Sequence, residues 1–553
     1  ARQIIQYINV LSFSLPLLYT EVNISDLCLL EALKIVSPEA YKTIRNNKAR
    51  ILGQMPDGVY MLVRFASDQE RKEAAEKEKQ DFKVLGLSSF IYAVVLTFCL
   101  YKNFSGITNV LWTVATVIYI AYVARKYEKK QKPINIFYDC VIILLGISNF
   151  TTDNQSILFF NYMVIFIAIA VNMIYMFIDI KKLGMCIQSM AVCQCIFGCI
   201  GELSKPFTHG IKALKMDKDR NKNIKYILIG VGCALPVVMM VTIILASADS
   251  VFRNMIVKIF KLDTLILNLT GIVIMIIVSY ALAYAFSFYV KNGKVYINEK
   301  ENKMAALPVN IIMSMVAVVY VMFATIQVVY LFGHGGSLPQ GYTYAQYARQ
   351  GFFQLLFLSC VNVLVILLTM EFVKVNKFMK VVSGVICLCT FIMIFSSEYR
   401  MKMYIEEYGL TFSRIFVLWL LVVIGMVMLG LVIKNFHKEL NLFSFSMVVV
   451  ICCFIVLSFS HVDYIIAKYN LSQCQYIMDK NKNDDPYEIN IYVDMDYIIN
   501  LSADSVPAVL DEKNEKVTRY LNKKRYYKKL EKYKDGGIRS FNLSRYNAGK
   551  NVK

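Results

Sequence analysis

The sequence predicts an all-α fold: a polytopic bundle of about 11 transmembrane helices followed by a small helical C-terminal extracytoplasmic domain. Of the 553 residues, 57% are hydrophobic, and the mean hydropathy is +0.49. Many apolar runs are close to 20 residues long and carry almost no charge, which is the length that a helix needs to cross a bilayer. Helices satisfy their own backbone hydrogen bonds in lipid, so helices rather than open sheets are expected to span it.

The charge and the cysteines narrow the possible partners. The formal net charge is +20, but the basic residues lie mostly in short loops between apolar runs, as they do in cytoplasmic loops of membrane proteins. We therefore expect the lipid bilayer as a partner and no nucleic acid. The 14 cysteines lie mostly inside apolar runs and lack the spacing of a zinc site. They predict packing residues, no metal site and no cofactor.

The first residues differ from the rest of the chain. Residues 1–54 are expected to form a short soluble helical segment, and residues 55–83 a charged helix that leads into the membrane. The stretches "RQIIQYINVLSFSLPLL" and "LLEALKIVSPEAYKTIRNNK" resemble the C-terminal part of KAP-family P-loop NTPases. The chain has no G-x-x-x-x-G-K-[ST] loop, so this resemblance implies no ATP hydrolysis. Met55 is a candidate natural start, which would make the first segment a fusion remnant.

The transmembrane bundle is expected over residues 84–460. The run at 184–202 contains Gln and Ser and is expected to be interfacial or re-entrant instead of crossing. The spans are expected at 84–101, 107–123, 134–149, 157–177, 224–246, 263–290, 305–332, 352–371, 378–397, 412–434 and 443–460.

Loop charge predicts the orientation. Basic loops at 125–132, 212–225, 291–303 and 374–380 are expected in the cytoplasm, which requires that 184–202 does not cross. The N-terminus is then cytoplasmic and the C-terminus extracytoplasmic. Asp139 and other polar residues inside spans are functional candidates by default, whereas Glu371, near a cytoplasmic end, is expected to snorkel to the interface.

Three loops and the tail are expected to share the extracytoplasmic face. The first loop follows residue 246, the second covers 333–353, and the third covers 396–416. The tail, 461–553, is expected to contain short packed helices and a basic, Tyr-rich stretch that faces anionic lipids, envelope polymers or solvent. The pentapeptide "SADSV" occurs in the first loop and again at 502–506, where Ser502 or Asp504 can start a helix.

A joint ligand site on this face competes with a simpler interpretation. Charged residues at a membrane edge are commonly solvated or snorkelling, and Tyr there is commonly an interfacial anchor. No catalytic residue and no metal ligand is predicted. The candidate ligand-binding residues are Asp249, Tyr344, Tyr347, Arg349, Glu398, Arg400, Tyr404, Arg414, Asp496 and Arg545.

Five separated motifs occur in a fixed order: "SADSVF", "LPQGYTYAQYARQGFF", "EYRMKMYIEEYGLTFSRIF", "DMDYIINLSADSVPAVL" and "SFNLSRY". Over residues 85–550 the chain resembles the DUF4173 (DUF4153-like) family of bacterial polytopic membrane proteins of unknown function. The resemblance implies a membrane protein and no particular reaction; the expected location is a bacterial cytoplasmic membrane. The matching residues are Asp249, Gly341, Tyr344, Tyr347, Arg349, Gly351, Arg400, Tyr404, Tyr408, Gly409, Thr411, Arg414, Asp496, Tyr497 and Arg545.

The leading hypothesis is a non-catalytic sensing, binding or envelope-associated protein with an extracytoplasmic platform. A secondary transporter or channel is the first alternative, and a water-filled cavity that reaches Asp139 would favour it. A membrane-embedded enzyme acting on lipid-linked substrates is the second, with Glu398, Arg400 and Arg349 in its site. A tail packed over the loops of a closed bundle would favour the platform.

Overall fold

A computed structural model describes most of the chain. It covers residues 49–54, 60–64, 68–178, 180, 183–215, 263–293, 304–333, 351–437, 439–480, 494–512, 523–531, 533 and 537–550, with scattered positions between 241 and 252. The chain divides into two compact units. The first comprises Ala1–Val84 and Phe207–Arg220, and the second comprises Leu85–Pro206 and Asn221–Lys553.

The first unit contains a β-hairpin where a helix was expected. Strands β1 (Ala49–Gln54) and β2 (Tyr60–Arg64) pair antiparallel, with an irregular register between Ile51 and Gly53. The turn-favouring sequence "PDG" at 56–58 separates two stretches with β-branched residues, which explains the hairpin. The predictions of helix for 1–54 and 55–83 were therefore wrong over these strands. The charged helix α4 (Asp68–Leu100) begins later, and Glu78 lies 3.9 Å from His209 of α9 (Lys205–Lys215).

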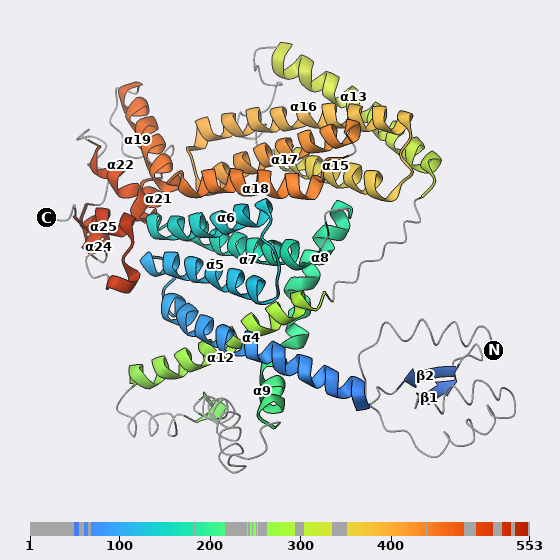
Figure 1. Ribbon diagram of the computed structural model, residues 1–553. Helices are drawn as coiled ribbons and strands as arrows, with labels where there is room; N and C mark the ends of the chain where they lie inside the picture. Colours follow the sequence, from blue (N-terminus) through green and yellow to red (C-terminus); the bar gives the residue numbers. More distant parts are fainter. Residues whose placement is uncertain are drawn as a thin grey trace. The chain divides into compact units, whose positions relative to one another are not determined.

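In the second unit, α5 (Ile107–Lys126), α6 (Pro133–Thr151) and α7 (Gln155–Phe177) lie side by side (Figure 1). Their sequences are apolar enough to face lipid, and buried polar side chains link them internally. Asn161 of α7 donates to Ser148 of α6 at 3.1 Å and accepts from Ser458 at 2.7 Å. Asn172 donates to Asp139 at 2.7 Å, so Asp139 takes part in a buried hydrogen bond between α6 and α7.

Helix α8 (Met185–Gly198) continues into the 3-10 helix η1 (Cys199–Glu202) and contacts α7 and α12 (Asp263–Lys291). Glu371 accepts the backbone N–H of Cys186 at 2.9 Å. A carboxylate at a helix N-terminus satisfies an otherwise orphaned N–H group and interacts well with the helix dipole. The expectation that Glu371 snorkels was therefore wrong, because α8 supplies it with donors.

Five later helices form a second group. They are α13 (Ala306–Gly333), α15 (Phe352–Phe372), α16 (Lys377–Tyr408), α17 (Phe412–Phe436) and α18 (Leu442–Phe459). Neighbours α13·α16, α15·α16, α16·α17 and α17·α18 pack together. Their shared core includes Ile366, Ile386, Met428 and Leu431, each at most 2% exposed.

The C-terminal elements gather at one end of α6 and α18 (Figure 1). They are α19 (Val462–Lys480), α21 (Met495–Asn500), η2 (Ala503–Ser505), α22 (Val506–Leu510), α24 (Lys523–Glu531), η3 (Ile538–Ser540) and α25 (Leu543–Lys550). Ser502 accepts the N–H of Asp504 at 3.4 Å and so caps η2. Ser502, and not Asp504, therefore has the capping role.

The helical membrane bundle predicted from the sequence is confirmed. Eleven helices of the described residues are long and apolar enough to cross a membrane. Ten of them correspond to expected spans. The eleventh is Met185–Glu202, which was expected to be interfacial or re-entrant and meets the length and composition of a span. The expected span 224–246 lies almost entirely outside the described residues.

Candidate functional site: the junction between tail and bundle

The short turn between α6 and α7 presents polar groups to the tail. Its sequence, Thr152, Asp153 and Asn154, separates two apolar helices, and all three residues are buried. Asn154 caps α7 by accepting the N–H of Ile157 at 3.0 Å. Because capping uses only the side-chain oxygen of Asn154, its NH₂ group can bond to another partner. The side chains of Thr152 and Asp153 are also left for other partners.

Asp504 of η2 is the central hydrogen-bond acceptor where the tail meets the α6–α7 turn. Its side chain is fully buried. It accepts the hydroxyl of Thr152 at 2.5 Å and the backbone N–H of Asp153 at 3.1 Å. A buried carboxylate is costly unless it is hydrogen-bonded, so these two bonds tie η2 to the turn. We call the residues Thr152–Asn154, His461–Asp463, Ser502–Asp504 and Asn542–Arg545 the tail junction.

Asp463 makes a parallel connection from the start of α19. It accepts the side-chain amide of Asn154 at 2.7 Å and the backbone N–H of Ser502 at 2.9 Å. His461 precedes it with a left-handed φ of 48°, and its Nδ1 lies 3.8 Å from the Asp504 carboxylate. Two aspartates on different elements thus join the same turn to the same segment of the tail.

Arg545 closes the tail junction from α25. Its Nε and Nη2 contact Oδ1 of Asp153 at 2.7 and 2.6 Å. Asn542 accepts the N–H of Arg545 at 3.1 Å, and its own amide donates to the carbonyl of Thr152 at 2.9 Å. Charge-assisted bonds of this kind are among the stronger protein hydrogen bonds. The predicted site residue Arg545 is therefore paired with a buried carboxylate while its own side chain stays 38% exposed.

Burial shifts several pKa values in the tail junction. Burial raises the pKa of Asp153, while the Arg545 guanidinium opposes the shift. Burial likewise raises the pKa of Asp463. Hydrogen bonding to Asp504, together with its negative charge, raises the pKa of His461 against the effect of partial burial. At 3.8 Å the contact between the half-exposed ring and the Asp504 carboxylate is longer than an ordinary hydrogen bond, so the pair is mainly a charge contact.

A second contact joins the tail to the turn between α4 and α5. The N–H of Ile107 donates to the carbonyl of Phe541 at 2.8 Å, and Asn103 donates to the carbonyl of Arg539 at 3.1 Å. Gly106 has φ of +129°, and a Cβ there would lie 3.0 Å from the backbone of Ser540. A side chain at Gly106 would be strained and would separate the two backbones.

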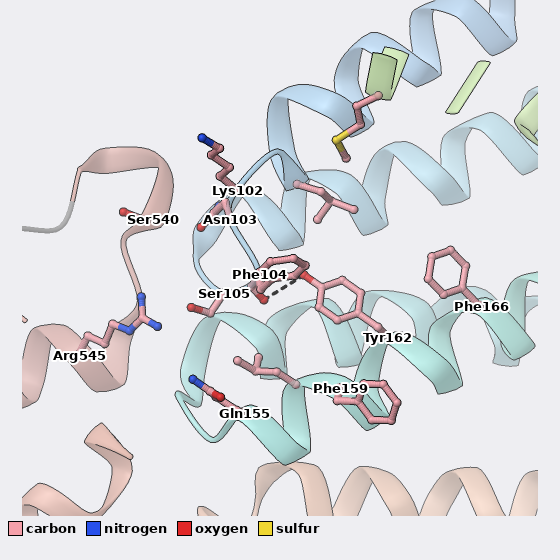
Figure 2. A pocket seen from close by; sticks show the side chains of 13 residues that line it. Lys102, Asn103, Phe104, Ser105, Gln155, Phe159, Tyr162, Phe166, Ser540 and Arg545 are labelled. Carbon is pink, nitrogen blue, oxygen red and sulfur yellow. Dashed lines mark hydrogen bonds between the residues drawn. The ribbon is translucent and has the colours of Figure 1, made fainter. Parts of the chain in front are cut away.

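A cavity of about 830 Å³ opens beside these contacts, and we call it the tail-side cavity. Figure 2 shows its polar residues near the tail and aromatic residues along α7. Phe104, Phe159 and Phe166 are 73%, 60% and 54% exposed, so its wall continues onto the exposed apolar surface of the bundle. The polar rim is formed by Lys102, Asn103, Ser105, Gln155, Ser540 and Arg545.

This cavity combines apolar walls with two basic groups at one end. Lys102 donates to Asn268 at 2.6 Å, and Arg545 is paired with Asp153, so both cations are held in place. Tyr162 donates to the carbonyl of Phe104 at 2.9 Å, which fixes one aromatic wall. Such a surface is suited to an amphipathic molecule with an anionic head. Among the described residues, no group of three or more His, Cys, Asp or Glu side chains is placed to hold a metal ion.

The structure brings together only some of the predicted site residues. The Arg414 guanidinium lies 4.4 Å from the centre of the Tyr404 ring and donates to the carbonyl of Tyr408 at 2.9 Å. This pair stabilises the end of α16. Close by, the Phe412 N–H donates to Tyr497 of the tail at 3.2 Å. The α16–α17 turn therefore meets the tail, as expected for a shared face.

Arg400 and Glu398 lie on the same end of α16. Arg400 is buried, with Nη2 3.5 Å from Gln327, and a Cβ on Gly351 would lie 2.8 Å from its Nη1. Glu398 is half-buried. Arg400 is nine residues before Gly409, about 14 Å along the helix, so it lies toward the tail end of the bundle.

The other predicted residues are dispersed or not described. Asp496 is exposed on α21, next to its N-cap Asp494. Asp249 is exposed, and most of the loop that follows it lies outside the described residues. Tyr344, Tyr347 and Arg349 also lie outside the described residues.

Sequence reasoning missed the acidic members of the tail junction. Asp153 lies in a four-residue polar break, "TTDN", between two apolar helices, and such a short turn leaves a carboxylate little access to water. Asp463 follows directly after a span, and Asp504 lies in a segment interpreted only as a helix start. The available signal was the presence of acids in very short breaks, which does not specify their partners.

The fold and this site define a polytopic α-helical membrane protein with a tail docked on one end of its bundle. The chain belongs to a family described as Domain of unknown function (DUF4153), whose model matches residues 139–512, more than half of the chain. No curated protein and no solved structure shows significant similarity to it. The match begins at Asp139, so the resemblance of residues 1–53 to KAP-family proteins stays a prediction, as does the DUF4173 designation.

Proposed function

We propose that this chain is a non-catalytic, ligand-binding protein of a bacterial cytoplasmic membrane, in which the tail and adjoining helix ends form an extracytoplasmic platform for an amphipathic anionic molecule. One observation carries the proposal. The tail is tied to the bundle through buried carboxylates, and the same tail supplies Ser540 and Arg545 to the rim of the tail-side cavity. Docking the tail thus builds part of the site.

Loop charge supports the orientation. The basic α5–α6 turn, with Lys129, Lys130 and Lys132, lies at the start of α6, whereas the tail meets the end of α6. Lysines concentrate in cytoplasmic loops, so the opposite end, with the tail, is extracytoplasmic. Labelling tests this assignment: a Ser540→Cys variant in intact cells should react with a membrane-impermeant maleimide, and Lys130→Cys should react only after permeabilisation. The reverse pattern would contradict the platform.

Trp112 gives a direct reporter for the tail-side cavity. Its ring centre lies 5.7 Å from that of Tyr162 and 6.0 Å from that of Phe166, and both of these residues line the cavity. In a Trp419→Phe background, Trp112 is the single tryptophan of the chain. Brominated phosphatidylglycerol in reconstituted vesicles should then quench Trp112 more strongly than brominated phosphatidylcholine with the same acyl chains.

Two charge variants separate binding from general attraction to the membrane. Lys102→Gln removes a rim cation and should abolish the preference for phosphatidylglycerol. Lys468→Gln removes an exposed cation of α19 that does not line the cavity, and the preference should persist. Equal quenching by both lipids, or equal effects of the two variants, would contradict the proposal.

Transport and catalysis stay as alternatives without a specific supporting observation. Neither the tail-side cavity nor the second cavity considered below is lined by Asp139, Glu398 or Arg400. Asp139 instead lies in the hydrogen-bonded pair with Asn172. The packing of the tail over the helix ends is the arrangement that favours a platform.

A further inference from the structure

Four lysines converge on one cavity at the end of the bundle away from the tail. The cavity has a volume of about 700 Å³, and its polar lining is Lys374, Lys377, Lys380, Lys434, Asn376 and Asn435. These residues come from the α15–α16 turn, the start of α16 and the end of α17. We call it the lysine cavity. It lies where three candidate spans end, at the edge of the apolar part of the bundle.

Backbone contacts hold the lining segments in place. Met304 donates its N–H to the carbonyl of Phe372 at 2.9 Å and accepts the N–H of Lys374 at 3.1 Å. Asn376 caps α16 by accepting the N–H of Met379 at 2.8 Å. The turn is therefore an ordered structure that sets the starting points of the lysine side chains.

The start of α16 is also tied to the end of α17. The Asn435 amide donates to the carbonyl of Lys380 at 2.8 Å. Next to it, the Lys434 ammonium donates to the carbonyl of Leu440 at 2.6 Å. Two separate helix ends thus keep their lysines around the same space.

The charge around the lysine cavity is one-sided. Its described lining includes four lysines and no Asp or Glu. Glu371 is close in sequence, but its carboxylate accepts N–H groups at the start of α8. The first turn of α16 has no acidic residue, although cations are unfavourable at a helix N-terminus. An anion in the cavity would reduce both the repulsion among lysines and the unfavourable interaction with the helix.

We propose that the lysine cavity binds a phosphate-bearing anion. Phosphate accepts hydrogen bonds from several ammonium groups and from amide NH₂ groups at once. Met370 and Val373 provide an apolar side to the cavity, which suits the phosphate head of a lipid whose chains enter the bilayer beside α15. The preference for lysine in cytoplasmic loops explains basic loops in general, but not the convergence of two loops on one cavity.

The test measures thermal stabilisation of the full chain in neutral detergent. The probes are short-chain phosphatidylglycerol, short-chain phosphatidylcholine with the same chains, and inorganic phosphate. A ligand that binds the native state raises the melting temperature with its concentration, which yields an apparent affinity. Lys377→Gln with Lys380→Gln should weaken binding of phosphatidylglycerol about 30-fold, equivalent to about 2 kcal/mol for two lysines.

Matched variants make the result specific. Lys129→Gln with Lys130→Gln removes two exposed lysines from another basic loop and should leave the affinity unchanged. Lys377→Arg with Lys380→Arg keeps the charge and should retain binding, which also controls for folding. Lys102→Gln alters the tail-side cavity and should not change the part of the stabilisation that depends on Lys377 and Lys380.

The probes distinguish the sources of the anion. Stabilisation by phosphatidylglycerol alone supports a lipid headgroup, and stabilisation by inorganic phosphate as well supports a soluble phosphate compound. Equal stabilisation by phosphatidylcholine, or equal loss in the two Lys→Gln pairs, would overturn the proposal.

Discussion

Replacing Asp504 should release the tail from the bundle. In the Asp504→Ala variant, the buried Thr152 hydroxyl and Asp153 N–H lose their acceptor, and each loss costs about 1–3 kcal/mol. His461 also loses its partner, but this ring is 46% exposed, so the loss adds little. We expect docking to weaken by about 3 kcal/mol in total.

The isosteric variant gives a graded comparison. Asp504→Asn keeps one oxygen that can accept from the Asp153 N–H, and its NH₂ can donate to the Thr152 hydroxyl. Because both bonds can form without the negative charge, we expect a loss of only about 1 kcal/mol. The expected loss of docking free energy is therefore larger for Asp504→Ala than for Asp504→Asn, because only the Asn side chain can replace the two bonds.

Hydrogen exchange measures this loss directly. If amides of α22 and α25 exchange through undocking of the tail, their rates should rise about 100-fold in Asp504→Ala and about fivefold in Asp504→Asn. Asp511→Asn is the control, because Asp511 is exposed in the same segment, and its rates should match those of the natural chain. Exchange in Asp504→Ala within twofold of the natural rate would show that Asp504 does not hold the tail.

Three further outcomes test neighbouring parts of the structure. Gly106→Ala should weaken tail docking by about 1–3 kcal/mol in a chemical denaturation assay, because the φ of Gly106 is +129° and the tail backbone is adjacent. Gly425→Ala is the control and should not weaken docking, because the space around Gly425 is open. Since the folded pKa of His461 is raised above 6.5, docking should be stronger at pH 6 than at pH 8.5, and His461→Gln should flatten this dependence; an unchanged slope would exclude the pair with Asp504. Glu371→Gln should speed exchange at the start of α8 about fivefold, equivalent to about 1 kcal/mol, and an unaffected α8 would contradict its capping role.

The positions of the helices could be predicted from the sequence because each long apolar run can satisfy its backbone only as a helix in lipid. Ten of the expected spans match helices of the structure, and hydrophobic length alone was enough to locate them. The hairpin at 49–64 and the span-like helix at 185–202 were less predictable, since a short apolar run with β-branched or polar residues fits more than one structure.

The site depended on contacts between distant residues. Asp153 and Asp504 are separated by 351 positions, and no local pattern indicates that one accepts a hydrogen bond from the other. The sequence showed Asp504 as a residue suited to a helix start, and the tertiary structure gave that role to Ser502 and placed Asp504 against the α6–α7 turn.

By itself, then, the sequence determined the class of protein, the approximate helix positions and the distribution of loop charge, because these follow from hydrophobic length and local composition. Only the tertiary structure decided which loops meet the tail, which carboxylates are buried together, and which lysines share a cavity. The physical reason is that burial and hydrogen-bond partners arise when helix ends far apart in the sequence are packed side by side.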